Sequence, residues 1–236
     1  MKAFLSKTSY LKGLQCDKAI YLYKKHFKLR DTVSPDKQAK FEKGHRVGEL
    51  ARGLFPGGTL VHVSKGYRYE EAVRTTQALI ESGCTSIYEA AFVSDGVLVY
   101  ADILIKTPEG WHLYEVKSSE RIKDVYKDDL ALQYYVLKSS GIPITGAGIV
   151  HLRQAYDSLQ NDIPLDAMFE ITDFTGYCLE KYAATKTAIQ RMKYICAGNT
   201  MPAVSTGPHC TVPYACDFTG FCHRATPSAE EGLFAI

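Results

Sequence analysis

The segment VLVYADILIKTPEGWHLYEVKSS, residues 97–119, carries the strongest structural signal in the sequence. Two β-type runs flank Thr107-Pro108-Glu109-Gly110, a short turn of the kind that joins antiparallel neighbours. In the second strand Glu115 and Lys117 share a face, because side chains alternate along a strand. Such a pair is common on a solvated strand face. It could instead deliver a metal ligand and a catalytic cation into a cleft, and other residues have to decide.

Asp102 favours the second interpretation, because it lies near the centre of the first strand with apolar neighbours on both faces. Burial of an unpaired carboxylate is costly, so Asp102 needs a cation, a metal ion or several donors. If the two strands pair through the turn, Asp102 lies beside Glu115, and their repulsion requires a cation between them. Mg²⁺ or Mn²⁺ would relieve that repulsion. With Lys117 positioning water or neutralising the transition state, this set predicts phosphodiester hydrolysis.

A third β-type run, SIYEAAFVS at residues 86–94, precedes these two across Asp95-Gly96, so the three runs predict an antiparallel meander. Glu89 in this run could be a further metal ligand or an ordinary strand-face carboxylate. Helices are expected at residues 9–27, 37–55, 69–81, 123–139 and 177–198, and further strands at 146–154 and 168–174. The first helix is expected to be interrupted by little except Gly13.

These elements predict an α/β fold, a central sheet with flanking helices. No internal repeat is present, so a single domain is the simplest organisation. Its expected parts are a helical N-terminal part at residues 1–83, a catalytic sheet core at 84–170, and a long helix with a Cys-rich tail at 171–236.

The composition is that of a globular protein: 236 residues, of which 46% are hydrophobic. The sequence contains no apolar stretch of about 18 residues and no signal-peptide pattern, which predicts a soluble cytoplasmic protein without membrane contact. Residues 1–52 hold 13 Lys and Arg against 5 Asp and Glu, so the rest of the chain holds 15 against 21. The basic N-terminal quarter suits phosphate attraction, and a solvated helical surface gives the same count. Its aromatic residues either stack unpaired bases or form helix cores: Tyr10, Tyr21, Tyr23, Phe27 and Phe41.

The seven cysteines, without an export signal, favour thiols that are buried, catalytic or metal-bound over a disulfide framework. Cys210, Cys216 and Cys222 are separated by five residues each. This spacing fits a zinc knuckle poorly and suits a looser polynuclear centre, which would need a fourth ligand. His209 and His223 lie beside these cysteines, so a zinc site mixing His and Cys stays open.

The residues of the predicted site resemble motifs of the PD-(D/E)xK nuclease superfamily, specifically its RecB-like branch: Asp102 in YADIL, Glu115-Val116-Lys117 in YEVKSS, and Gln133 in the following helix. The resemblance implies a restriction-endonuclease-like mixed sheet flanked by helices. It also implies metal binding by Asp102, Glu115 and the Val116 carbonyl, with Lys117 and Gln133 in the catalytic site.

Two positions depart from this family pattern. Gln133-Tyr134-Tyr135 matches the usual Q-x-x-x-Y only loosely, and the pair Asp129 and Gln133 is an alternative register. Gly48 stands where the family places a metal-binding His in the second helix, so His45 or Glu49 could take that role, or the metal ion lacks this ligand.

The cysteines strengthen the resemblance. RecB-like nucleases of the AddB type, and the exonucleases of CRISPR adaptation, hold an iron–sulfur cluster with one N-terminal and three C-terminal cysteines. Cys16 resembles the first of these, and Cys210, Cys216 and Cys222 resemble the others with wider spacing. The resemblance therefore implies a structural [4Fe–4S] cluster in a C-terminal appendage, which joins the two ends of the chain.

The sequence thus predicts a metal-dependent DNA nuclease, an exonuclease acting on single-stranded ends. DNA is the expected partner, together with possible proteins of a repair or CRISPR-adaptation complex. Two alternatives remain open: a catalytically silent nucleic-acid-binding module, and a zinc-stabilised scaffold.

Overall fold

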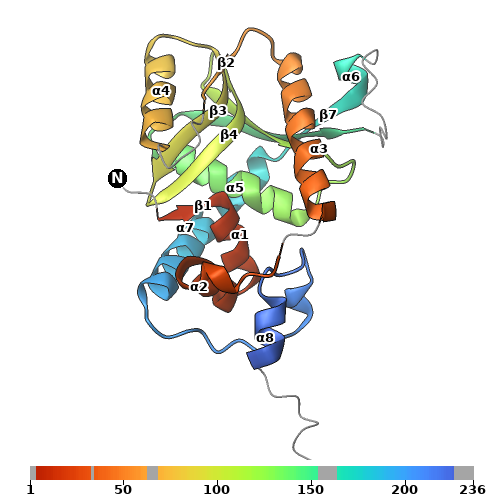
Figure 1. Ribbon diagram of the computed structural model, residues 1–236. Helices are drawn as coiled ribbons and strands as arrows, with labels where there is room; N and C mark the ends of the chain where they lie inside the picture. The colour runs from red at the N-terminus through yellow and green to blue at the C-terminus, as the bar shows by residue number, and fades with distance from the viewer. Residues whose placement is uncertain (1–3, 33–34, 63–68, 154–163, 226–236) are drawn as a thin grey trace, which may run out of the picture. The chain divides into compact units, whose positions relative to one another are not determined.

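The computed structural model describes residues 4–32, 35–62, 69–153 and 164–225 (Figure 1). The chain forms two compact units. Unit 1 comprises Met1–Lys7 and Pro35–Thr187, and unit 2 comprises Thr8–Ser34 and Ala188–Ile236. Within the described ranges, no helix is both long and apolar enough to cross a membrane.

A seven-stranded mixed sheet forms the centre of unit 1, with strand order β2-β3-β4-β5-β6-β7 and β1 paired to β4. The three predicted runs form its antiparallel meander, because short turns join them in sequence. β6 runs parallel to β5, as expected for two strands joined by a helix. The strands are β1 (Leu5–Ser6), β2 (Thr59–Leu60), β3 (Ser86–Ser94), β4 (Val97–Lys106), β5 (Trp111–Lys117), β6 (Ile144–Leu152) and β7 (Phe169–Asp173).

Helices cover this sheet (Figure 1). α3 (Pro35–Ala51) buries Val47 and Ala51 in an apolar cluster with Ile103 and Val150 of the sheet. α5 (Asp124–Ser139) lies on the other face, where its buried polar residues meet Glu115. The remaining elements of unit 1 are η2 (Arg52–Leu54), α4 (Tyr69–Glu81), α6 (Leu165–Met168) and most of α7 (Thr175–Ala197). A mixed sheet flanked by helices therefore confirms the predicted α/β class.

Unit 2 contains short helices and irregular segments. Its elements are most of α1 (Lys7–Gln15), then α2 (Asp17–Lys25), η1 (Phe27–Leu29), the end of α7, η3 (Pro208–Cys210) and α8 (Thr219–Ala225). Its core includes a cluster of Ala19, Leu22 and Phe218, and Ile20, Ile189 and Met192 are also buried. Buried and half-buried polar contacts supplement this core: Lys12 forms an ion pair with Asp217 at 2.5 Å, and the amide of Gly220 donates to Asp31.

The prediction of one helix over residues 9–27 is wrong, because the helix breaks at Cys16. Cys16 has extended backbone angles at the N-cap of α2, while Gln15 at the end of α1 donates to the carbonyl oxygens of His209 and Tyr214. Gly13, the expected point of interruption, lies inside α1. A Cβ there would lie 2.6 Å from Met192 Sδ, so close packing explains this glycine.

Candidate active site and cysteine cavity

The pairing of β4 with β5 brings Asp102 and Glu115 together. The ladder pairs Ile103 with Tyr114, and this register continues to place Asp102 opposite Glu115 on the same face of the sheet. The amide of Val116 donates to Asp102 Oδ2 at 2.7 Å, which fixes the carboxylate between the strands. The sequence motif therefore converges in space as two carboxylates on one face.

Glu115 is almost completely buried and accepts hydrogen bonds from three side chains. Lys117 bonds its Oε1 atom, and Lys7 bonds the same oxygen at 2.7 Å. Gln133 donates to Oε2 at 2.6 Å. The predicted residues Glu115, Lys117 and Gln133 thus contact one another, and a second lysine joins them.

Asp129 completes this network from the buried side of α5. Its Oδ2 atom lies 2.8 Å from Lys117 Nζ and 3.3 Å from Lys7 Nζ. The amide nitrogen of Gln133 lies 3.4 Å from Asp129 Oδ1. Lys7 and Lys117 therefore bridge the same two carboxylates, Glu115 and Asp129.

These contacts shift the pKa values of the site in opposite directions. Burial, followed by the charge of Glu115, raises the pKa of Asp102 to about 8. Burial would also raise the pKa of Glu115, but Lys117 and Lys7 outweigh it and the pKa is lowered. For Lys117, burial opposes ionisation and the charges of Asp129 and Glu115 prevail, so its pKa is raised. At neutral pH the Lys117 side chain is therefore a cation, which suits electrostatic stabilisation.

Glu89 lies opposite Asp102 in the β3–β4 register, at a position where the ladder is interrupted. Its φ of 54° falls in the left-handed region, which is strained for a non-glycine residue. The carboxylate is one-third exposed and pairs with Arg52 at 3.0 Å. In this arrangement Glu89 contributes negative charge near Asp102, with Arg52 as its direct partner.

The remaining predicted metal ligands lie in different surroundings. His45 and Glu49 are exposed on α3, the helix that packs on the opposite face of the sheet. Among the described residues, no hydrogen bond or ion pair joins either one to Asp102 or Glu115. Val116 contributes its amide to Asp102, as described above.

The carboxylate site has the chemistry of a divalent-cation site. Charging Asp102 beside Glu115 is unfavourable, and a bound cation would remove that penalty. The buried oxygen Gln133 Oε1 has no hydrogen-bond partner, which is unusual for a buried polar atom and suits a water molecule in this site. Asp102 and Glu115 would hold the ion. Within the described residues, no three His, Cys, Asp or Glu side chains are already grouped closely enough to do so.

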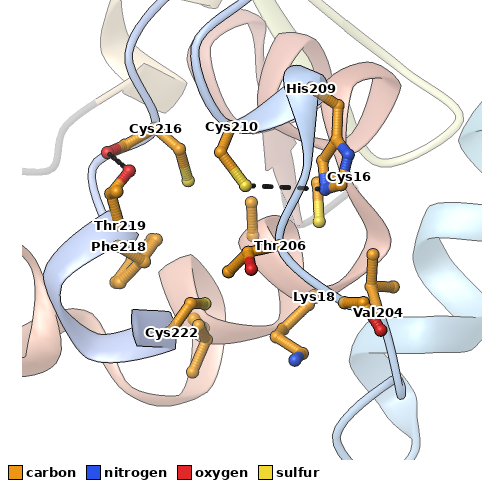
Figure 2. Close-up of a pocket in the computed structure, with 13 residues that line it drawn as sticks. Cys16, Lys18, Val204, Thr206, His209, Cys210, Cys216, Phe218, Thr219 and Cys222 are labelled. Carbon is orange, nitrogen blue, oxygen red and sulfur yellow. Dashed lines mark hydrogen bonds between the residues drawn. The ribbon is translucent and has the colours of Figure 1, made fainter. Parts of the chain in front are cut away.

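Unit 2 contains a cavity lined by four thiols. Cys16, Cys210, Cys216 and Cys222 all border it, and Figure 2 shows the four sulfur atoms around the same space. They come from the α1–α2 break, η3, the following loop and α8. All seven cysteines of the chain are free thiols in the structure. Residues separated by about two hundred positions therefore contribute to one cavity.

The cavity is largely apolar. Ala19, Leu22 and Phe218 are buried beside Cys16, Cys216 and Cys222. Burial raises the pKa of Cys216 and Cys222, so these thiols are neutral without a bound cation. His209 also borders the cavity, with Nε2 3.7 Å from Cys210 Sγ. Thiolate donors of this kind are those that iron–sulfur clusters use, and His209 adds an imidazole that zinc also binds. As with the carboxylates, no three of these side chains are already grouped closely enough within the described residues to hold a metal ion.

The aromatic residues of the N-terminal segment separate into two groups. Tyr10 and Tyr21 are buried, and Tyr21 donates to the carbonyl oxygen of Asn199. Phe27 is 47% exposed, with the Arg30 guanidinium 4.5 Å from its ring centroid. Tyr23 is half-buried beside Phe27, and the Phe41 side chain lies outside the described residues. Phe27 is the side chain of this set most available to a base.

No protein-family model matches the chain, and no curated protein matches it. Among solved structures, the chain is similar to LHK-Exo, whose crystal structure is in complex with dAMP. The identity is 12%, the match covers 82% of this chain and 87% of that chain, and the TM-score is 0.36. The site assignments therefore rest on the residues of this chain.

Proposed function

We propose that the protein is a metal-dependent deoxyribonuclease of the PD-(D/E)xK type, acting as an exonuclease on single-stranded DNA ends. The observation that carries this proposal is the convergence of Asp102, Glu115 and Lys117 on one face of the sheet. Two carboxylates and a lysine at this spacing are what the resemblance to the RecB-like branch implies. The excess of basic residues in the N-terminal quarter suits attraction of a nucleic acid.

Each residue has a defined role in this reaction. A Mg²⁺ or Mn²⁺ ion bound by Asp102 and Glu115 would supply a Lewis acid and lower the pKa of a bound water. Lys117 is held in place by Asp129 and remains protonated, so its ammonium group stabilises negative charge that develops on the phosphodiester. Gln133 holds Glu115 through its amide nitrogen and directs an unpaired carbonyl oxygen into the buried site. This oxygen can accept a hydrogen bond from a water molecule.

The four cysteines of the cavity are proposed to hold a [4Fe–4S] cluster with a structural role. The shared apolar cavity supports this role, because it brings Cys16 beside Cys210, Cys216 and Cys222. A cluster bound by Cys16 and Cys222 would cross-link distant parts of the chain without a disulfide, which suits a reducing compartment.

One assay tests the reaction. Anaerobically purified protein is mixed with Mn²⁺ or Mg²⁺ and with end-labelled single-stranded, double-stranded and circular single-stranded DNA. We expect Mn²⁺-dependent degradation of the linear single strand, and a loss of about hundredfold or more in Lys117→Ala. The variant should keep DNA binding and the visible absorbance of the cluster. Lys106→Ala, at an exposed position of β4, is the matched control and should cleave normally.

The same assay separates the alternatives. A wild-type protein that binds DNA and never cleaves it would identify a silent binding module. Purified protein that contains zinc and shows no iron–thiolate absorbance would identify a zinc-stabilised scaffold. Cleavage of the circular strand would replace the exonuclease assignment with an endonuclease.

A further inference from the structure

Lys7 is the residue of the active site that nothing in the motif pattern indicates. It lies directly after β1, whose pairing with β4 fixes the backbone at Leu5 and Ser6. Its ammonium group lies 2.7 Å from Glu115 Oε1 and 3.3 Å from Asp129 Oδ2. These are the two oxygen atoms that Lys117 also contacts. The site thus holds two ammonium groups between the same pair of carboxylate oxygens.

Glu115 cannot keep all of these partners and also bind a divalent ion. Lys7 and Lys117 both donate to its Oε1 atom, and Gln133 occupies Oε2. A metal ion requires a direct bond of about 2.0–2.1 Å to a carboxylate oxygen if it is Mg²⁺. An ammonium group on that oxygen competes for the same position and repels the ion. One of the two lysines must therefore move when the ion binds.

The geometry identifies Lys7 as the lysine that moves. Its side chain is 31% exposed, whereas that of Lys117 is 17% exposed. Lys117 is also closer to Asp129 and lies 5.1 Å from the Tyr126 ring centroid, so it has further partners to hold it. Lys7 is partly exposed to solvent, and its backbone directly follows β1, which pairs with β4. Rotation of its side chain leaves the ammonium group near the site.

We propose that Lys7 alternates between two partners: it neutralises Glu115 and Asp129 before metal binding, and it contacts the phosphate of the DNA after the ion has displaced it. This inference rests on the proposed nuclease function. Before loading, the lysine compensates a carboxylate pair that would otherwise repel itself. After loading, a mobile ammonium group beside the ion is placed to bind an anionic oxygen of the substrate. Lys7 is then a catalytic residue that the E-x-K motif does not include.

The test uses Lys7→Met, which keeps the length of the side chain and removes its charge. In the full-length protein without DNA, Mn²⁺ affinity is measured by electron paramagnetic resonance. We expect Mn²⁺ to bind about tenfold more tightly, because a competing positive charge has left the ligand. Single-turnover cleavage with saturating Mn²⁺ should be about a hundredfold slower, because the phosphate contact is lost. Opposite changes in metal affinity and rate are the signature of the two roles.

Two further variants make the result decisive. Lys127→Met removes a partly exposed lysine paired with Asp124 in the same unit and should change neither quantity. Lys7→Arg keeps the charge, so it should bind Mn²⁺ with an affinity within about threefold of the wild type. This variant still tests the role of the charge if Lys7→Met does not fold. Unchanged or weaker Mn²⁺ binding in folded Lys7→Met overturns the proposal, as does wild-type cleavage by that variant. If the wild type binds Mn²⁺ and cleaves nothing, the nuclease function and the phosphate contact fail, while the affinity measurement still decides whether Lys7 competes with the ion.

Discussion

The two candidate cofactor sites of this protein differ in how their charges are balanced without a cofactor. In unit 1, Glu115 and Asp129 are neutralised by Lys7 and Lys117 through contacts that the structure already contains. In unit 2, the four cysteines line an apolar cavity, and burial raises the pKa of Cys216 and Cys222. The first site is compensated by charged groups of the protein itself, whereas in the second burial favours the neutral thiols of Cys216 and Cys222.

This difference implies different dependence on the cofactor. We expect the compensated carboxylate site, on a seven-stranded sheet, to fold without its proposed metal ion, which would add reactivity. We expect the cysteine cavity to depend on its proposed cluster, because a ligand that binds only the folded state contributes directly to folding.

Loss of the cluster should produce the largest effect, and only in unit 2. We expect Cys222→Ala to abolish the visible absorbance and to expose the amides of residues 8–32 and 188–225 to rapid hydrogen exchange. Metal binding contributes on the order of 10 kcal/mol to the folding of small metal-dependent domains, which is comparable with the whole stability of a typical domain. Hydrogen-exchange mass spectrometry measures both units in one experiment, and residues 86–152 should keep their protection.

A second cysteine serves as the control. Cys84 is half-buried in unit 1, where it contacts the carbonyl oxygen of Ser86. Cys84→Ala should retain the absorbance and the exchange pattern of the wild type. If Cys222→Ala leaves unit 2 protected, the cavity does not need a cofactor to fold and the contrast between the units is lost.

The strands of the active site could be predicted because their signals are local. The two β-type runs in residues 97–119 and the short turn at Pro108 predict two adjacent antiparallel strands, and adjacency brings Asp102 to Glu115. These steps use neighbours in sequence, so strand pattern and turn chemistry suffice. Gln133 was indicated only by the resemblance to the RecB-like motifs, and it is buried on α5.

Lys7 and Asp129 show where that reasoning ends. Lys7 is separated from Glu115 by 108 residues and belongs to a basic segment, in which it resembled one of many surface lysines. β1 and β2 contain two residues each, which is too few for a periodic hydrophobic pattern. β1, the strand that positions Lys7, could therefore not be predicted. Asp129 was only weakly indicated, as a carboxylate four residues before Gln133 on one face of the helix. From the sequence, Asp129 and Gln133 were only an alternative match to the helix motif of the RecB-like branch.

The helix break at Cys16 is a further feature that the local sequence did not predict. Propensity favours a continuous helix through LQCDKA, because none of these residues stops a helix strongly. The break becomes understandable only with the contacts of Gln15 to His209 and Tyr214, about 200 residues away in sequence. Tertiary contacts thus override local propensity at the residue that brings the first thiol to the cavity.

Removal of a carboxylate from the compensated site should have the next largest effect. Glu115→Ala removes one of the two carboxylates that Lys7 and Lys117 share and leaves them only Asp129. Breaking one partner out of a buried ion pair typically costs about 3–5 kcal/mol, so we expect a decrease of that size in the free energy of unfolding of unit 1. Urea denaturation without divalent ions, followed by the far-ultraviolet signal, measures it.

Glu89→Ala is the matched control for this loss. Glu89 is a strand carboxylate near the same site, but its ion pair with Arg52 is partly exposed. Exposed pairs contribute about 0–1 kcal/mol, so this variant should unfold close to the wild type. Equal destabilisation by the two substitutions would contradict the view that buried charge compensation holds the active site together.

The smallest predicted effect is a pH dependence that belongs to unit 1 alone. The pKa of Asp102 is about 8 in the folded protein and has an ordinary value of 3.8, so between these values the native state binds a proton that the unfolded chain lacks. The stability that Asp102 contributes is therefore complete below the lower value and is lost as pH rises through about 8, with a slope of at most about 1.4 kcal/mol per pH unit. Asp129 has a raised pKa from burial and adds a slope of the same sign. Urea unfolding of the metal-free protein at several pH values from 5 to 8 measures this slope.

Asp102→Asn isolates the contribution of this one carboxyl group. The variant cannot ionise at this position, so its stability should fall less steeply with pH than that of the wild type, and near pH 8 the variant should be the more stable protein.

Other titrating groups do not distort the range from pH 5 to 8. Glu115 stays ionised throughout, because Lys117 and Lys7 lower its pKa. Cys216 and Cys222 add no slope there either, since burial raises their pKa above the ordinary value of 9.0. Asp166→Asn, at an exposed position of α6, should leave the slope unchanged. Parallel pH profiles for the wild type and Asp102→Asn would mean that folding does not raise the pKa of Asp102. The argument for a cation between Asp102 and Glu115 would then fail.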